Sequence, residues 1–292
     1  LMFYIYTMYQ KIYDFCKVRN IGTVFENDPN DPTPRVKFLI GLLESLGLEY
    51  ELDKSKSGKT TIYNIILRGS SSKMVVAHHD VANPSIDNAN DNSCSVINAI
   101  ATKIAEPSVH VVLLDGEEFG GLGSQRVSDQ IKNGDFGKID YVLNLELTGI
   151  GGKNFFVGNC DSKLKNSIVD KFGCPIFNTP FNDSVIFRKN GIDSCVVNPL
   201  PQKPPPQEIE DELDLDFDDL DFDDDLDDFD LDGILTRPNY SRYETHVKYG
   251  DRYLDHTILY RCHTSEDTVD KISTDDMKEF VEEVVLKIIR NV

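Results

Sequence analysis

The sequence predicts one α/β domain of three layers, α/β/α, with a mixed, largely parallel, twisted sheet in the middle. Short apolar runs alternate along the chain with segments of helical periodicity, which is typical of a sheet covered by helices on both faces. The length of 292 residues suits one large domain, and a content of 40% apolar residues suffices for its core. Residue types that bind metals or move protons gather where predicted strands end, as they do in open α/β sheets.

Two helices are expected near the N-terminal end. Leu1–Cys16 is apolar and aromatic, and its polar residues recur with helical spacing. Arg35–Leu46 also fits a helix, because Pro34 suits a first helical turn and Gly47 suits the position just past the end. The segment Asn27–Pro34 between them is rich in Asn, Asp and Pro and is expected to be a loop.

Strands and helices then alternate along the chain. Tyr50–Leu52 and Ile62–Leu67 are predicted strands on either side of a turn at Lys54–Gly58. The next predicted elements are a strand at Lys73–Ala77, a helix at Ser95–Ile104, a strand at Val109–Leu114, a helix at Gly123–Ile131 and a strand at Tyr141–Leu147. The second half adds helices at Ser162–Phe172 and Ser184–Asn190, a strand at Ser194–Val197 and a closing amphipathic helix at Thr274–Arg290.

Residues 201–238 differ in composition from the rest of the chain. A Pro-rich start leads into Asp, Leu and Phe repeats, and Glu208–Asp232 contains 16 of the 50 acidic residues but no Lys or Arg. Such charge density opposes compaction, so we expect a disordered acidic insertion within the single catalytic domain 1–292. The alternative is a segment that recruits a basic partner. Without this acidic tract the net charge is only −4 instead of −20. The rest of the chain contains no cluster of basic residues that could hold a phosphate backbone, so no nucleic-acid partner is expected.

The six cysteines are scattered and form no CxxC pair, which favours reduced thiols and a cytoplasmic location. Several lie in apolar runs, where a thiol behaves as a small hydrophobic group. The apolar N-terminus lacks the basic region of a signal peptide, and no stretch is long and apolar enough to span a membrane, so no membrane partner is expected. Because the chain begins with Leu1, a leader removed earlier stays an open alternative.

Polar motifs follow the strand predicted to end at Ala77. In an extended chain His78 and Asp80 point the same way, so the carboxylate can hold the imidazole in the orientation that a metal ion needs. By itself this motif is weak, because a structural histidine would have the same pattern. Asp91 lies in the polar stretch just before the predicted helix at Ser95, where it could offer two oxygens to two cations. An ordinary N-terminal cap at Ser93 is compatible with that role.

Carboxylates also stand at the ends of two further strands. Glu117 and Glu118 are adjacent and surrounded by glycines, and such neighbours repel unless a cation neutralises one of them. One can then be a ligand and the other a base. Glu146 interrupts an apolar strand, where a charge is costly unless it is paired or bound to metal. His263 follows another apolar run. Together these residues offer an N/O donor set suited to zinc.

The order of these motifs resembles the di-zinc aminopeptidase family of metallopeptidases, family twenty-eight. That family includes bacterial leucyl-type aminopeptidases, glutamate carboxypeptidase II and the glutaminyl cyclases, and the resemblance implies the zinc-peptidase fold, which is phosphorylase/hydrolase-like. The motifs that carry it are His78-x-Asp80, Asp91-Asn92, Glu117-Glu118, Asn144-Leu145-Glu146 and His263-Thr264. The similarity spans roughly residues 35–292 outside the acidic tract, and it extends to Asn182-Asp183-Ser184 and Gly191-Ile192-Asp193.

The resemblance implies two bound Zn²⁺ ions, each with two ligands of its own and one ligand that both share. His78 and Glu146 would hold one ion, Glu118 and His263 the other, and Asp91 both. A water or hydroxide would bridge the ions. One departure from the family pattern is Glu146, which stands where most members have Asp.

The resemblance also implies how catalysis would proceed. Glu117 would be the general base that takes the proton of the bridging water and later gives it to the departing amine. Asp80 would orient His78. Members of the family carry a cis peptide after the bridging aspartate, which would fall at Asp91-Asn92.

The function that follows is a zinc-dependent exopeptidase of aminopeptidase type, acting on a peptide substrate with a free N-terminus. Two alternatives are kept: a glutaminyl cyclase-like acyltransferase with one zinc, and a non-catalytic binding protein on a peptidase fold. Glutaminyl cyclases tend to carry tryptophans near the site, and this chain has none. No proposed ligand or base is missing, which disfavours the binding protein. Side-chain preference depends on loops such as Asn239–Asp255, and the oligomeric state is not predicted.

Overall fold

The computed structural model describes residues 2–18, 32–58, 60–82, 86–200, 262, 263, 265 and 267–292. Within them, eight strands form one sheet in the order β1-β2-β4-β3-β5-β8-β6-β7. The predicted acidic insertion and the loop Asn239–Asp255 lie outside the described residues, so both stay predictions. The strands are β1 (Glu51–Ser57), β2 (Thr60–Leu67), β3 (Lys73–His78), β4 (His110–Leu114), β5 (Tyr141–Leu145), β6 (Phe155–Gly158), β7 (Ile176–Phe177) and β8 (Ser194–Pro199).

The middle of the sheet is parallel and its flanks are mixed. β4, β3, β5 and β8 run parallel to one another, whereas β2 joins β4 and β6 joins β8 in antiparallel pairs. In the register, Val75 pairs with both Val111 and Leu143. Every described side chain of β4, β5 and β8 is buried, which explains why these strands are mostly apolar.

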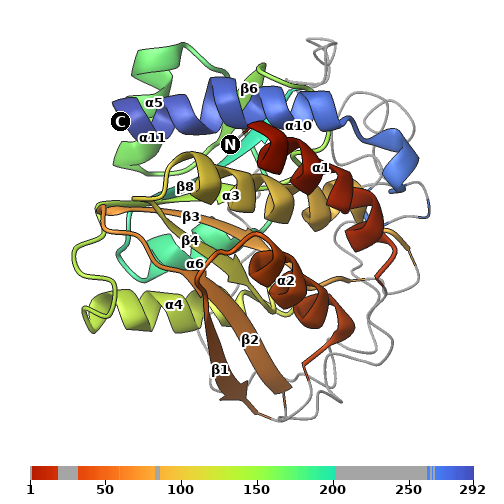
Figure 1. The fold of residues 1–292 in the computed structure, drawn as a ribbon. Helices are drawn as coiled ribbons and strands as arrows, with labels where there is room; N and C mark the ends of the chain where they lie inside the picture. Colours follow the sequence, from red (N-terminus) through yellow and green to blue (C-terminus); the bar gives the residue numbers. More distant parts are fainter. Residues whose placement is uncertain are drawn as a thin grey trace.

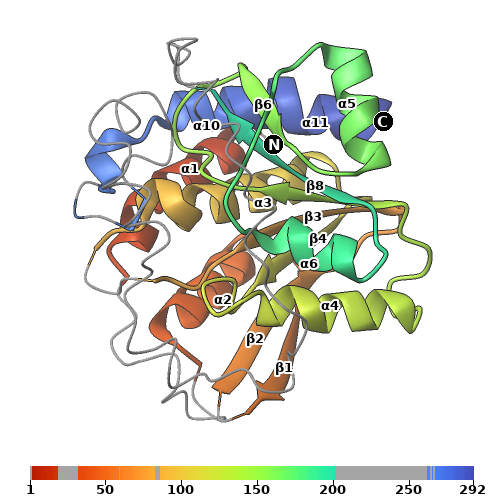
Figure 2. The same cartoon turned by 180° about the vertical axis from the view of Figure 1, so that it is seen from behind.

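Helices cover both faces of the sheet, as predicted (Figures 1 and 2). The helices on one face are α1 (Met2–Cys16), α2 (Pro34–Ser45), α3 (Cys94–Ala105), α5 (Lys163–Phe172), α10 (Thr274–Phe280) and α11 (Leu286–Asn291), which share one large apolar core. α4 (Leu122–Lys132) and α6 (Asp183–Lys189) cover the other face, with Val127 and Phe187 packed in a second core against β3 and β4. The sequence therefore forms a three-layer α/β/α domain with a mixed, mostly parallel sheet.

Short polar signals set several helix boundaries. Thr33 caps α2 by accepting the amide of Val36, and Pro34 occupies its first turn. Three short irregular helices adjoin the regular ones. They are the π-helical turns η2 (Ala89–Ser93) and η7 (Val281–Val285) and the 3₁₀ turn η6 (Val269–Lys271). η7 lies between α10 and α11, so the predicted closing helix Thr274–Arg290 is continuous but contains a π-helical turn.

Two local predictions were wrong. Lys54–Gly58 is not a turn, because β1 continues to Ser57 and pairs residue by residue with β2. The alternating exposure of its polar side chains shows an edge strand with one face in solvent, which lacks the apolar run used to detect strands. The strands β6 and β7 were not predicted, because they are too short to show a strand pattern in the sequence. No helix within the described residues has the length and apolarity needed to cross a membrane.

Candidate metal centre

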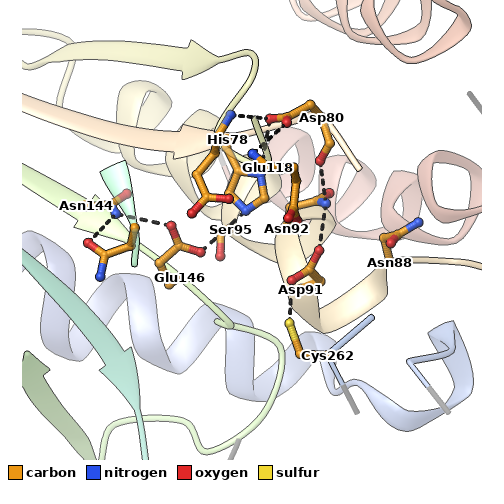
Figure 3. A network of polar contacts seen from close by, with 12 residues as sticks. His78, Asp80, Asn88, Asp91, Asn92, Ser95, Glu118, Asn144, Glu146 and Cys262 are labelled. Carbon is orange, nitrogen blue, oxygen red and sulfur yellow. Dashed lines mark hydrogen bonds and ion pairs between the residues drawn. The ribbon is translucent and has the colours of Figure 1, made fainter. Parts of the chain in front are cut away.

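The predicted site residues meet at one edge of the sheet. His78 is the last residue of β3, Glu117 and Glu118 follow β4, and Glu146 follows β5. Because β4, β3 and β5 are neighbouring parallel strands, their carboxyl ends lie together. Glu146 is thus not inside a strand as predicted, since β5 ends at Leu145. Figure 3 shows His78 between Asp80 and Glu146, with Glu118 nearby.

His78 is held between two carboxylates. Its Nε2 lies 3.5 Å from Oε2 of Glu146, and its Nδ1 lies 3.3 Å from Oδ1 of Asp80. Burial opposes the charged imidazole, but the two carboxylates together raise the pKa of His78 well above its usual value. The position therefore attracts positive charge, whether a proton or a metal ion.

Asp80 also shapes the loop that carries the two glutamates. Its Oδ1 accepts the amide of Glu117 at 3.1 Å and its Oδ2 accepts the amide of Glu118 at 3.0 Å. Although burial acts to raise it, the pKa of Asp80 is held below its usual value by His78 and by these amides. Asp80 thus contacts both His78 and the loop that carries Glu117 and Glu118, which is compatible with the predicted orienting role.

A second group forms around His263. Its Nε2 lies 2.8 Å from Oε1 of Glu118 and 3.4 Å from Oδ1 of Asp91. The thiol of Cys262 donates to the same Oδ1 of Asp91 at 2.7 Å. Ligand-type atoms of Asp91, Cys262 and His263 all lie within 4.8 Å of one another, as do those of His78, Glu117 and Glu118.

The backbone around Asp91 is held by the C-terminal part of the chain. Asp267 accepts the amides of Asn90 and Asp91 at 2.7 and 3.0 Å, and Asp87 accepts the amide of Val269 at 3.0 Å. Burial and the nearby Asp91 raise the pKa of Asp267 to about 7. The segment that carries His263 is therefore fastened to the segment that carries Asp91.

The peptide bond between Asp91 and Asn92 is trans, so the cis bond expected from the family resemblance is absent here. Both residues belong to the π-helical turn η2, and helical hydrogen bonding requires trans peptide units. Arg35 supports this turn from α2. Its guanidinium donates to Oδ1 of Asn92 at 2.6 Å and to the carbonyl of His79 at 2.9 Å.

Glu117 lies at the centre of the site and is only 4% exposed. Burial raises its pKa well above the usual value, and Glu118, Glu146 and Asp183 raise it further, while His78 acts in the opposite direction. Asp183, at the start of α6, is completely buried, and burial raises its pKa to about 7. So many buried carboxylates around two imidazoles leave an excess of negative charge, which fits a centre built to bind cations.

His79, the neighbour of His78, is buried and contacts the backbone of β2. Its Nε2 contacts the carbonyl of Tyr63 at 2.9 Å, and burial lowers its pKa to about 4 from the ordinary value of 6.5. Below pH 6.5 His79 is protonated in the unfolded chain, whereas in the folded chain it becomes protonated only near pH 4. Folding is therefore weakened as the pH falls through this window.

A His79→Gln variant, which keeps a donor toward Tyr63 but does not titrate, tests this linkage. The stability of the wild type relative to the variant should fall by up to about 3 kcal/mol between pH 7 and pH 4. Urea unfolding at several pH values measures the difference. A difference that stays constant with pH would contradict the buried neutral state of His79.

Four residues at or beside this centre had no functional role predicted from the sequence. Cys262 was grouped with thiols that act as small hydrophobic residues, although its place next to His263 was a signal. Asp267 and Arg35 had no signal of their own, because their partners lie far away in the sequence. Gly123 was seen only as part of a glycine-rich stretch. A Cβ there would stand 2.3 Å from the carbonyl oxygen of Asp115, so glycine lets α4 begin against the end of β4.

Comparison with protein families agrees with this geometry. The family model described as peptidase family M28 matches residues 64–288, which is most of the chain and covers every predicted ligand. The chain belongs to peptidase family M28. The comparison with curated protein sequences returned no match.

Solved structures of M28-type enzymes share the fold. The LapA aminopeptidase of Legionella pneumophila is 13% identical, with a TM-score of 0.60 over 99% of this chain and 70% of that one. The glutaminyl cyclase of Porphyromonas gingivalis is 16% identical, with a TM-score of 0.62 over 100% of this chain and 99% of that one. The glutaminyl cyclase of Bacteroides thetaiotaomicron is 16% identical, with a TM-score of 0.60 over 99% and 98%. The architecture is thus common to M28 aminopeptidases and cyclases.

Proposed function

We propose that this chain is a zinc-dependent exopeptidase that removes residues from the free N-terminus of peptides, using two Zn²⁺ ions. The observation that carries the proposal is the arrangement around Glu117. His78 faces Glu146 on one side, and His263 faces Glu118 on the other. Asp91 stands next to His263, where it can serve as the shared ligand of both ions.

Two features of the chain fit zinc at this place. The donor set of imidazoles and carboxylates is one that zinc uses in catalytic sites. Despite burial, carboxylates raise the pKa of His78, and Cys262 together with Glu118 and Asp91 raises the pKa of His263, so a cation can replace the protons that the site attracts. His78 and Glu146 would hold one ion, Glu118 and His263 the other, and Asp91 both.

Bound zinc would polarise the scissile carbonyl and lower the pKa of water. Glu117 takes one proton from the attacking water onto a carboxylate oxygen and delivers it to the nitrogen of the departing amine. Its buried position favours both steps. Burial raises the pKa of the carboxyl toward neutral pH, where the same group can both take and release a proton. Asp80 keeps His78 oriented through the Nδ1 contact.

The test combines metal analysis with activity. Protein purified without chelator is expected to contain about two zinc ions per chain. It should hydrolyse aminoacyl-nitroanilides, lose this activity when zinc is removed and regain it when zinc is restored. N-acetylated substrates serve as the control, since an aminopeptidase requires a free amine. Absence of bound metal, or equal hydrolysis of acetylated substrates, would reject the proposal.

A second candidate is a glutaminyl cyclase-like acyltransferase with one zinc. It is favoured by the coverage of nearly the whole Porphyromonas gingivalis cyclase, against 70% of the Legionella aminopeptidase. A single zinc per chain and cyclisation of N-terminal glutamine would support it instead. A non-catalytic binding protein is the third candidate, and the presence of Glu117 among the ligands argues against it. A cytoplasmic location and a basic partner for the acidic tract also stay predictions.

A further inference from the structure

Cys262 stands among the predicted zinc ligands although sequence analysis assigned it no role. Its Sγ lies 2.7 Å from Oδ1 of Asp91, and the Nε2 of the next residue, His263, lies 3.4 Å from the same oxygen. The thiol is buried, and Figure 3 shows it directly below the carboxylate of Asp91. Sulfur, nitrogen and oxygen donors thus converge from two segments that lie 171 positions apart.

The backbone brings the two adjacent side chains into one place. Neighbouring residues of an extended chain point to opposite sides. His263 instead has φ +62°, in the left-handed region that non-glycine residues seldom adopt. The bend directs both Cys262 and His263 toward Asp91. Such a conformation costs free energy and persists where surrounding contacts impose it, here the contacts of His263 with Glu118 and Asp91.

We propose that Cys262 is a further zinc ligand, a thiolate that binds the same ion as Asp91, Glu118 and His263. The inference rests on the proposed function, because it concerns one of the two zinc ions of that site. On binding, the S–H proton leaves to solvent and a Zn–S bond forms. Thiolate is a strong zinc ligand and often occurs in sets with histidine.

This ligand makes the two metal positions unequal. Asp91, Glu118, Cys262 and His263 supply four protein donors, the number that zinc has in closed sites. The ion held by His78 and Glu146 then keeps the open position that substrate needs. Metal removal should accordingly occur in two steps, with the zinc bound by Cys262 leaving last.

Zinc X-ray absorption on the wild-type protein tests the inference without any variant. With about two zinc ions bound, the spectrum should contain a sulfur neighbour at about 2.3 Å beside nitrogen and oxygen neighbours at about 2.0–2.2 Å. The cobalt-substituted protein should show thiolate-to-cobalt charge-transfer absorption in the near ultraviolet. Nitrogen and oxygen neighbours alone, at full zinc loading, would overturn the inference and leave the proposed function intact. Failure to bind any zinc would instead reject the proposed function.

Cys262→Ser separates a ligand from a hydrogen-bond donor. The serine hydroxyl still donates to Asp91, so a merely positioning role would leave zinc affinity near the wild-type value. Loss of a ligand should lower the zinc affinity of the tighter site by more than ~10–100-fold, which is the loss expected when only a hydrogen-bond partner of a ligand is removed. It should also abolish the charge-transfer band. Cys160→Ser is the matched control, because Cys160 is half-buried near Ser194, away from these donors, and should change neither readout.

Discussion

Replacing Glu117 by Gln is expected to lower kcat by about 10²–10⁴-fold while the protein keeps its zinc. Glutamine has nearly the same size as glutamate and fills the same buried position, but it cannot take a proton from water. Rates on the best aminoacyl-nitroanilide, measured together with zinc content, give the result. The thermal unfolding temperature of the variant should stay close to that of the wild type. The substitution removes a carboxylate that neighbouring carboxylates crowd, so no stabilising charge is lost.

The neighbouring residue provides the matched comparison. Glu118→Gln removes the carboxylate whose Oε1 lies 2.8 Å from Nε2 of His263, so this variant should lose zinc as well as activity. The two substitutions are chemically identical and one position apart. If Glu117→Gln lost zinc as readily, or kept activity within about tenfold, the division into base and ligand would be wrong.

The Asp91→Asn variant is expected to lose at least one of the two zinc ions and to lower kcat/KM by at least ~100-fold, the upper range for losing an outer partner of a metal ligand. The reason is the proposed role of Asp91 as shared ligand, together with its observed contacts, in which one oxygen faces both Cys262 and His263. An amide keeps the shape but removes the negative charge that a shared ligand supplies. Equilibrium dialysis against buffered zinc gives the number and affinity of the ions.

Asp87→Asn, on the same stretch of chain, is the control for this substitution. Asp87 is buried, accepts the amide of Val269 and pairs with Lys17. Its amide counterpart can still accept the Val269 amide, so zinc content and kcat/KM should stay within about twofold of the wild type. Unchanged zinc binding in Asp91→Asn would remove Asp91 from the ligand set.

Much of the fold could be predicted because its central elements are locally simple. β3, β4, β5 and β8 are mostly apolar, so each gives a clear strand signal, and α2 carries Thr33 and Pro34 at its start. The edge strand β1 was shortened in the prediction because one of its faces meets solvent and its residues are polar. Its pairing with β2 depends on hydrogen bonds that no local pattern reveals.

The site was accessible to sequence analysis for a related reason. His78, Glu117 and Glu146 lie at or just after the ends of strands, and parallel neighbouring strands end at the same edge, so order along the chain predicts proximity. Asp267 and Arg35 follow no such rule. Each acts through backbone groups or amide side chains of a distant loop, which only the folded chain brings within hydrogen-bonding distance.

By itself the sequence determined the α/β architecture and the family, because strand patterns and short motifs are local properties. The zinc ligands that it predicts stay predictions. The tertiary structure alone decided how those residues are grouped and what supports them. It set Cys262 against Asp91, fastened Asp267 to the amides before α3 and left the Asp91-Asn92 peptide trans. These contacts join segments separated by most of the chain, and their geometry follows from packing rather than from any pattern of neighbouring residues.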